Sequence, residues 1–352
     1  MSCATGTPDW SGVTLETFNQ TLLNNPRLCT TCTCPLELEG HIIGIMSYFP
    51  SLAGNALLAA IFGLCLLPQL YLGIRHRTWG YLIAMTGGLV LEVVGYIGRI
   101  MLRDNMFTDT YFIMQVLPSL VCLTIAPAFL TAAVYLTLSR LVVIYAPDRS
   151  RLRPQVYTYI FITCDLVALI LQAAGGAMAS MADPGAPTQQ AGIDTMIAGV
   201  AWQVVSLGLF GLLSLEFWLR ARAAPLNPAF AELRARRLFQ PAFVVAVASA
   251  GVVIFVRCVF RCAELSAGFD GPLANDEVTL MVLEGAMIAL ACILLTVFHP
   301  SIAVGPDAWS AASAKEARKR GSPSISDVEN SGQELASQTW TSLDGGGRGF
   351  RR

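Results

Sequence analysis

Six charged side chains lie inside or at the end of three long apolar stretches of the 352-residue sequence, the second, sixth and seventh, where an unpaired charge is costly. Inserting one charge into hydrocarbon costs about 2.5–3.5 kcal/mol, so each of these side chains needs a partner or a function. Three are acidic and three are basic, and their charges sum to zero. With an accompanying tyrosine, the set is Glu92, Tyr96, Arg99, Arg257, Arg261, Glu264 and Glu284. The balance predicts that these charges neutralise one another.

The spacing of these residues predicts which helix faces they occupy. Separations of three, four and seven residues place the set from Glu92 to Arg99 on one face of a helix. The set from Arg257 to Glu264 shares one face of another. Glu92 and Arg99 are two turns apart, about 10 Å, which is too far for a direct ion pair. We therefore expect one polar cluster that joins the second, sixth and seventh helices, either to fix their packing or to contact a substrate.

Asp165 differs from these charges because no basic residue lies at its depth in another helix. It falls near the middle of its apolar run, seven residues before Gln172, so the two side chains share a helix face. An ionisable group inside a membrane marks a functional site by default. Asp165 and Gln172 are therefore candidates for binding a proton or a cationic substrate. The alternative is an interhelical hydrogen bond made by a neutral carboxyl group.

Pro127 lies in the middle of the third apolar run. It has no backbone N–H, so a helix loses one hydrogen bond there. Pro127 either fixes a static kink or serves as a gating hinge. The pairs Gly87-Gly88 and Gly175-Gly176 are typical of surfaces where membrane helices approach closely.

Transmembrane helices must position these residues. Apolar residues make up 54% of the chain and charged residues 13%, against roughly 25% charged residues in an ordinary globular protein. About twenty apolar residues span a bilayer. Seven runs meet that length and are too long for strands: 44–70, 79–102, 112–142, 156–180, 194–219, 241–263 and 278–299. We predict an all-α integral membrane protein with seven transmembrane helices.

Basic residues in the connections predict the orientation. They gather after the first, third and fifth helices and in the tail, whereas the 4–5 and 6–7 connections hold none. By the positive-inside rule, the amino terminus lies outside and the carboxyl terminus in the cytoplasm, which places the polar cluster in the outer half of the bilayer. We divide the chain into an extracellular segment 1–43, a membrane domain 44–300 and a disordered cytoplasmic tail 301–352 that is rich in Ser, Gly and Arg.

The amino-terminal segment carries the glycosylation acceptor Asn19 in the sequence Asn-Gln-Thr, which agrees with an extracellular position. Cysteines in this segment would sit in an oxidising compartment, where disulfides persist. The disulfide candidates are Cys3, Cys29, Cys32 and Cys34. Three connectivities stay open. We expect no metal site, because the ligand spacing is poor.

Missing residues exclude several function classes. The lysines are Lys315 and Lys319, and neither follows a glycine, so the chain has no P-loop for ATP. No apolar run holds a lysine for a retinal Schiff base, and three histidines are too few for a His-box di-iron centre. A net charge of −1 gives no field that would recruit nucleic acid. Without a nucleophile–base pair, we expect no enzyme activity and no cofactor.

Five motifs occur in register along the seven helices. They are Glu92-x-x-Gly95-Tyr96-x-x-Arg99, Ala126-Pro127-Ala128-Phe129 with Tyr135, Asp165 with Gln172 and Gly175-Gly176, Gly199 with Gln203, and Arg257-x-x-Phe260-Arg261-x-x-Glu264-x-x-x-Gly268. Over residues 44–300 the chain resembles the fungal lipid-translocating exporter family, the seven-helix aminocholesterol-resistance and sphingoid-base-export proteins. One departure lies in the seventh helix, where Glu277 and Glu284 match the acids of the family but residues 278–280 supply no tyrosine.

This resemblance implies a plasma-membrane protein that exports or flips amphiphiles such as sphingoid long-chain bases and gives resistance to toxic ones. Its partners would be membrane lipids or amphiphilic small molecules. Two alternatives stay open: a seven-helix receptor or lipid sensor, and a self-protection exporter for an amphiphilic secondary metabolite. Against the commonest receptor class, the third helix ends in Ser139-Arg140-Leu141 instead of Asp-Arg-Tyr.

Overall fold

The structure, a computed structural model, describes most of the membrane domain and little outside it. The described residues are 14, 17, 37–38, 41–42, 51–102, 117–145, 150, 154–182, 186–222, 242–266 and 277–312. The glycosylation acceptor Asn19 and the disulfide candidates Cys3, Cys29, Cys32 and Cys34 lie outside these residues. The predictions made for them therefore stay predictions.

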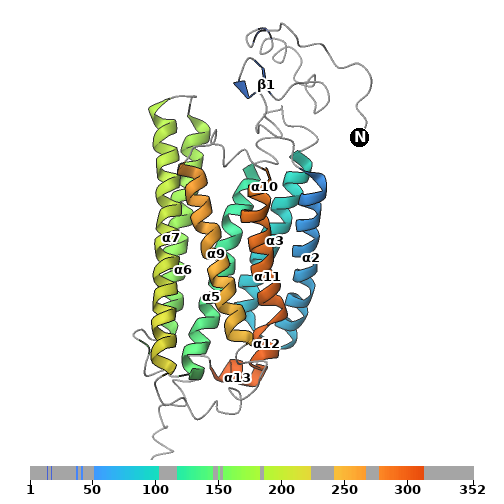
Figure 1. Ribbon diagram of the computed structural model, residues 1–352, viewed down its shortest axis with the longest axis vertical. Helices are drawn as coiled ribbons and strands as arrows, with labels where there is room; N and C mark the ends of the chain where they lie inside the picture. Colours follow the sequence, from blue (N-terminus) through green and yellow to red (C-terminus); the bar gives the residue numbers. More distant parts are fainter. Residues whose placement is uncertain are drawn as a thin grey trace, which may run out of the picture.

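Six long helices and one interrupted helical segment form a bundle in the described residues (Figure 1). The six are α2 (Leu52–Arg75), α3 (Trp79–Leu102), α5 (Leu117–Tyr145), α6 (Pro154–Met181), α7 (Pro187–Arg222) and α9 (Val244–Ser266). The seventh segment comprises α10 (Glu277–Leu280), the π-helix η5 (Met281–Ala286), α11 (Met287–Val297) and α12 (Pro300–Ala303). All seven are long and apolar enough to cross a membrane, which confirms the predicted helical membrane protein.

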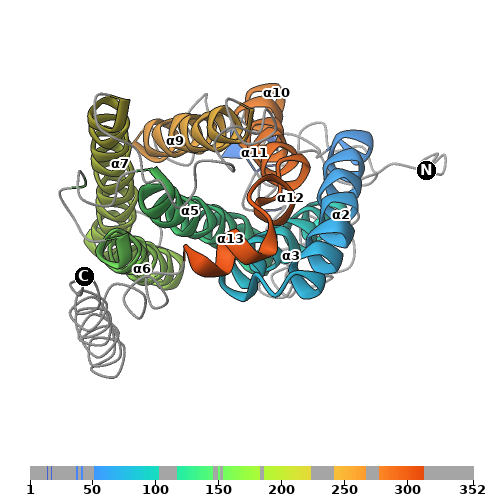
Figure 2. The same ribbon diagram turned by 90° about the horizontal axis from the view of Figure 1, so that it is seen from below.

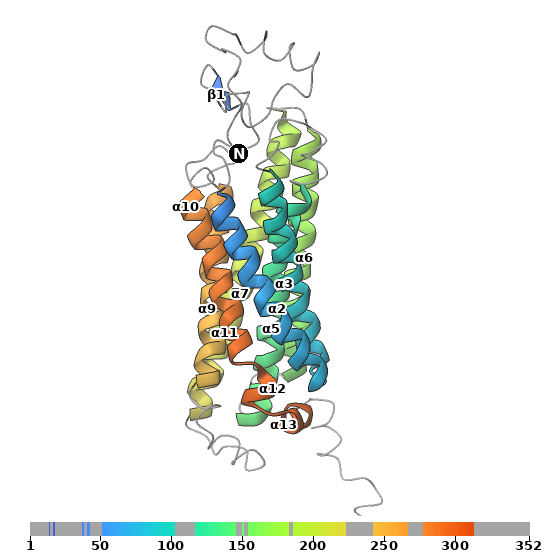
Figure 3. The ribbon, with the colours of Figure 1, turned by 90° about the vertical axis from the view of Figure 1, so that its right-hand side faces the viewer.

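The helices run along one long axis of the molecule, as Figures 1 and 3 show. Helix α5 packs against α3, α6, α7 and α9 and lies between them in Figure 2. We call the end of the bundle where α2 begins the upper end. The lower end is the one where α13 (Pro306–Ala311) lies. Beyond the upper end, β1 (Glu37–Leu38) and β2 (His41–Ile42) form a two-residue antiparallel pair.

The first transmembrane helix is displaced from the predicted run 44–70. It begins at Leu52 because the Ser51 side chain accepts a hydrogen bond from the Gly54 N–H (3.3 Å) and caps the helix. The backbone N–H of Ser51 also donates to the carboxylate of Glu277, which ties the start of α2 to the seventh segment. The helix then continues to Arg75, the first basic residue of the following connection.

The first residues of the predicted tail are helical and pack across the lower end of the bundle (Figure 2). The ring of Trp309 in α13 is 6% exposed and lies edge-on to Tyr81, with 6.2 Å between centroids. The guanidinium of Arg140 lies 5.3 Å from the centre of the same ring. His299 meets Tyr81 edge-on at 5.2 Å. Because these aromatic contacts hold α12 and α13, the folded part of the chain extends to residue 312 and does not end at 300.

Helices α6 and α7 approach each other most closely at glycines. A Cβ atom added at Gly175 would lie 2.6 Å from the carbonyl oxygen of Gly192. One added at Gly192 would lie 2.5 Å from the backbone nitrogen of Ala179. Backbone atoms cannot yield as side chains do, so small residues are required on this surface. This contact packs the part of α6 that carries Gln172 against α7.

Replacing Gly192 with Ala should lower the free energy of unfolding by about 1–3 kcal/mol, because the added methyl group meets backbone atoms of α6. Gly211→Ala is the matched control on α7, since nothing lies within 4 Å of its Cβ position. That control should keep or slightly raise stability, by up to about 1 kcal/mol, through helix propensity. Thermal unfolding in detergent measures both. Equal melting temperatures for Gly192→Ala and the wild type would contradict the close approach.

Candidate functional site

Glu284 is the centre of a polar cluster toward the upper end of the bundle. Its carboxylate is bound by Arg99 of α3 (Nη2 to Oε2, 3.3 Å) and by Arg257 of α9 (Nη2 to Oε1, 3.1 Å). The side chains of Arg257 and Glu284 are 4% and 8% exposed. One acid in η5 therefore ties together the three helices that the sequence analysis expected the cluster to join.

The remaining charges of the polar cluster also lie near opposite charges. Arg261 donates to Glu264 one turn later in α9 (2.8 Å), and both side chains are buried. Glu92 of α3 is 2% exposed and interacts electrostatically with Arg257. Each arginine faces a carboxylate, so a substrate that bound at Glu284 or Glu264 would have to displace an existing ion pair. The geometry favours a clamp between helices over a contact for cargo.

A π-helical turn and Gly285 make room for this clamp. Glu284 lies in η5, and π-helical turns inside α-helices are rare and frequently occur at functional sites. A Cβ atom added at Gly285 would lie 2.5 Å from Leu58 Cδ1 and 2.8 Å from the Tyr96 hydroxyl oxygen. The ring of Tyr96 stacks on Phe62 of α2, with 5.6 Å between centroids. Neither the π-helix nor the need for glycine at 285 was predicted from the sequence.

Pro127 supplies the polar cluster with a hydrogen-bond acceptor. Because proline has no N–H, the carbonyl oxygen four residues earlier, that of Leu123, loses its helical donor. Arg257 Nη2 donates to this oxygen (3.1 Å). Helix α5 continues through Pro127 from Leu117 to Tyr145. In this structure Pro127 frees a carbonyl oxygen that Arg257 binds. Its role as a gating hinge stays a prediction.

A second polar centre surrounds Asp165 between α5, α6 and α7. The Asp165 carboxylate is 3% exposed and accepts a hydrogen bond from Thr131 Oγ1 of α5 (2.7 Å). The hydroxyl of Tyr135, one turn after Thr131, lies close enough to Asp165 to interact with it. Among the described residues, no basic side chain forms an ion pair with Asp165. Its carboxylate is therefore held by the Thr131 hydroxyl, with the Tyr135 hydroxyl nearby, and no cation among the described residues neutralises it.

Gln172 lies two turns from Asp165 on α6 and reaches α7. Its Nε2 donates to Gln203 Oε1 (3.2 Å). Ser206 is one turn farther along α7, and its side chain is also buried. We refer to these six side chains as the Asp165 centre: Thr131, Tyr135, Asp165, Gln172, Gln203 and Ser206. Thr131 and Ser206 were not predicted, because most hydroxyl groups in apolar helices bond their own backbone and give no distinguishing signal.

Metal ligands do not gather in the part of the chain that the structure describes. No group of three or more His, Cys, Asp or Glu side chains there could hold a metal ion. The described cysteines are free thiols, namely Cys65, Cys122, Cys164, Cys258, Cys262 and Cys292. The buried ones pack as small apolar side chains. The buried polar side chains of the described residues are therefore carboxylates, arginines, amides, hydroxyls and the imidazole of His299.

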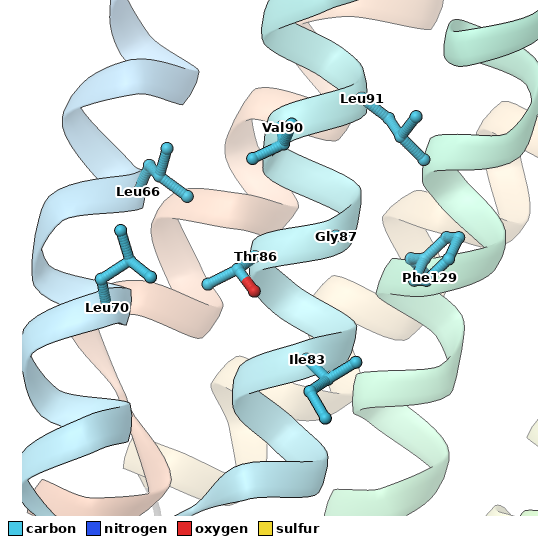
Figure 4. A pocket seen from close by; sticks show the side chains of 8 residues that line it. All are labelled: Leu66, Leu70, Ile83, Thr86, Gly87, Val90, Leu91 and Phe129. Atoms are coloured by element: carbon cyan, nitrogen blue, oxygen red, sulfur yellow. The ribbon is translucent and has the colours of Figure 1, made fainter.

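A surface groove between α2, α3 and α5 has a volume of about 570 Å³ (Figure 4). It is lined by Leu66, Leu70, Ile83, Thr86, Gly87, Val90, Leu91 and Phe129. The hydroxyl of Thr86 is already used, since it donates to the Leu82 carbonyl oxygen (2.6 Å). This groove suits lipid tails and offers nothing to a polar headgroup. The Asp165 centre is the better candidate for a headgroup contact.

Comparisons with known proteins cover both polar centres. A family model described as "RTA1 like protein" matches residues 85–307. The sphingoid long-chain base transporter RSB1 of Saccharomyces cerevisiae (strain Lalvin EC1118 / Prise de mousse) is 31% identical over 282 residues, which is 72% of this chain and 72% of the relative.

Two further relatives from Saccharomyces cerevisiae match a shorter stretch. Protoporphyrin uptake protein 1 is 28% identical over 211 residues, 60% of this chain and 65% of the relative. Protein RTM1 is 27% identical over 223 residues, 63% of this chain and 68% of the relative. No solved structure matches the chain.

Proposed function

Because the chain belongs to the RTA1-like protein family, we propose that it moves lipid-like amphiphiles across a membrane and that Asp165 contacts their cationic headgroup. The observation that carries the proposal is a buried carboxylate with one bonded hydroxyl and no counter-charge among the described residues. A relative of the chain is named as a transporter of sphingoid long-chain bases. Such a molecule joins an ammonium group to a long apolar tail, and the ammonium group supplies the cation that Asp165 lacks.

Such a cargo needs an opposite charge for its headgroup and an apolar environment for its tail, and different parts of the bundle provide them. A charge inside the membrane is far more stable beside an opposite charge, because the low dielectric strengthens their attraction. Asp165 provides that charge inside the protein, while the outward-facing side chains of the helices are apolar, such as Leu64, Leu67 and Leu212. The headgroup is thus held between helices while the tail stays in contact with lipid.

We assign the direction as export and the location as the plasma membrane, on the similarity to the long-chain base transporter. Another relative is named as an uptake protein, so the test must follow both directions. Cells with and without this chain are loaded with labelled dihydrosphingosine, and the label is followed in the medium and in the cells. We expect faster release and better survival with the chain. Equal release and equal uptake in the two cell lines would contradict the proposal.

The lower end of the bundle faces the cytoplasm in this proposal. Arg75 at the end of α2, together with Arg220 and Arg222 at the end of α7, lies there, which agrees with the positive-inside rule. The amino-terminal segment is then extracellular and open to glycosylation at Asn19.

Asn19→Gln should therefore remove a glycan-sized shift in gel mobility, because the acceptor amide is lost. Glycosidase treatment of the wild type should give the same mobility as the variant. Removal of a carboxyl-terminal tag by protease added to intact cells would show the opposite orientation.

A further inference from the structure

The Asp165 centre holds buried polar atoms that have no hydrogen-bond partner. They are Asp165 Oδ1, the Tyr135 hydroxyl, Gln203 Nε2 and Ser206 Oγ. The four side chains are between 0% and 6% exposed. A buried polar atom without a partner carries its full desolvation cost, so native proteins rarely leave several together. The Tyr135 hydroxyl lies beside Asp165 and can donate to it, so Gln203 Nε2 and Ser206 Oγ are the atoms that need a polar partner which the described residues do not supply.

Two contacts between α6 and α7 show that these atoms lie in one layer. Phe161 meets Phe210 with 5.2 Å between ring centroids. Gln172 donates to Gln203 at 3.2 Å. The helices are antiparallel neighbours, and Asp165 lies between Phe161 and Gln172 on the same face of α6.

On α7 the stripe facing α6 carries Ser206 between Gln203 and Phe210. The two contacts therefore bracket Asp165 and Ser206 at the same level of the bundle. Tyr135 of α5 closes the third side, since its ring lies 4.5 Å from that of Phe210 and 5.6 Å from that of Phe161.

The orientation of the Gln203 amide decides what the occupant must offer. Gln203 Oε1 accepts from Gln172, so its Nε2 is the end left free. An amide nitrogen only donates hydrogen bonds, whereas an ammonium group has no acceptor. A plain alkylammonium could satisfy Asp165 Oδ1 but not Gln203. The occupant needs an oxygen atom beside its cation.

Ser206 and Tyr135 add two hydroxyl groups, which both donate and accept. The Asp165 carboxylate can bind an ammonium group, and the Gln203 amide and the two hydroxyls can bind hydroxyl groups. Together they fit an amine with hydroxyl groups on neighbouring carbons. Resting on the proposed function, we propose that Gln203 and Ser206 select long-chain amino alcohols over long-chain amines without hydroxyl groups. Asp165 holds the ammonium group, Gln203 donates to a neighbouring hydroxyl oxygen, and Ser206 bonds the same or the next hydroxyl.

The test compares two cargoes in proteoliposomes that contain the full-length protein. Dihydrosphingosine carries two hydroxyl groups beside the amine, and octadecylamine has the same chain length and amine but no hydroxyl. Ser206→Ala should lower dihydrosphingosine flux about three- to tenfold, the loss expected for one hydrogen bond. It should change octadecylamine flux less than twofold. Gln203→Leu should shift the preference in the same direction.

Ser214→Ala is the matched control, because the Ser214 hydroxyl donates to the Phe210 carbonyl oxygen of its own helix (2.6 Å). It should alter neither flux. Fluxes are divided by the amount of folded protein recovered after reconstitution, which separates lost contacts from lost folding.

Three results would overturn the inference. If Ser206→Ala and Gln203→Leu change both fluxes equally, the Asp165 centre does not distinguish cargoes by their hydroxyl groups. If they change neither flux, ordered water alone fills the place. Either result leaves the proposed transport intact, because the wild type still moves both amines. If the wild type moves neither cargo, the proposed function itself fails, and the inference fails with it.

Discussion

Asp165→Asn should lower the export of amine-bearing amphiphiles roughly ten- to hundredfold while leaving the amount of protein at the membrane unchanged. The amide keeps the shape of the carboxyl group and can still accept from Thr131 Oγ1. It carries no charge, so it loses the attraction to an ammonium group. A hydrogen bond to a charged group contributes about 1.5–3 kcal/mol, which corresponds to this range of rates. Efflux from cells at matched surface level measures the effect.

Two comparisons make the Asp165 prediction specific. Asp194→Asn is the matched control in the neighbouring helix, because Asp194 is exposed and only accepts from Gln190 four residues earlier (3.0 Å). That change should leave efflux as in the wild type. Neutral amphiphiles should be affected less than amines by Asp165→Asn. Full efflux of a cationic long-chain base by Asp165→Asn would remove Asp165 from the mechanism.

Glu284→Gln should cost about 3–5 kcal/mol of stability, because it leaves the buried Arg257 and the partly buried Arg99 without their shared carboxylate. Most of the protein should then fail to fold or to reach the surface. The matched control is Glu216→Gln, which removes the partner of Arg220 in an ion pair whose side chains are 32% and 44% exposed. Exposed pairs contribute about 0–1 kcal/mol, so this control should fold normally. Thermal unfolding in detergent and surface abundance measure both variants.

A double-mutant cycle separates the clamp from a cargo contact. Arg257→Gln gives up the bond from Nη2 to the Leu123 carbonyl oxygen, but it also removes one of the charges that Glu284→Gln leaves unpaired. The double variant should therefore be more stable than the sum of the single changes predicts. Normal abundance of Glu284→Gln together with lost transport would show instead that Glu284 touches the cargo.

Run length predicted the seven helices well, because twenty or more apolar residues leave few other structures available in a membrane. The ends were harder to predict. The first run begins eight residues before α2, since apolar residues alone do not show that Ser51 accepts from Gly54 and starts the helix. The helices α12 and α13 were missed because their support is tertiary, through the aromatic ring of Trp309.

Charge balance predicted which residues belong to the polar cluster, but it did not predict which of them form ion pairs. Only the folded chain shows that one carboxylate, Glu284, serves both Arg99 and Arg257. The acceptor freed by Pro127 is a local consequence of proline chemistry, yet its use depends on where α9 packs. Ser206 illustrates the limit most clearly, because a serine in an apolar run has no pattern that reveals whether its hydroxyl is free.

The most direct measurement of the central claim is the flux of a headgroup-labelled long-chain base across proteoliposomes containing purified protein. Wild type and Asp165→Asn are compared at equal amounts of protein, with and without a proton gradient. We expect the wild type to move the base well above protein-free vesicles and Asp165→Asn to move it at least about tenfold more slowly. Flux at the rate of protein-free vesicles, under every gradient, would contradict transport by this chain. Equal flux by the two proteins would contradict the role of Asp165.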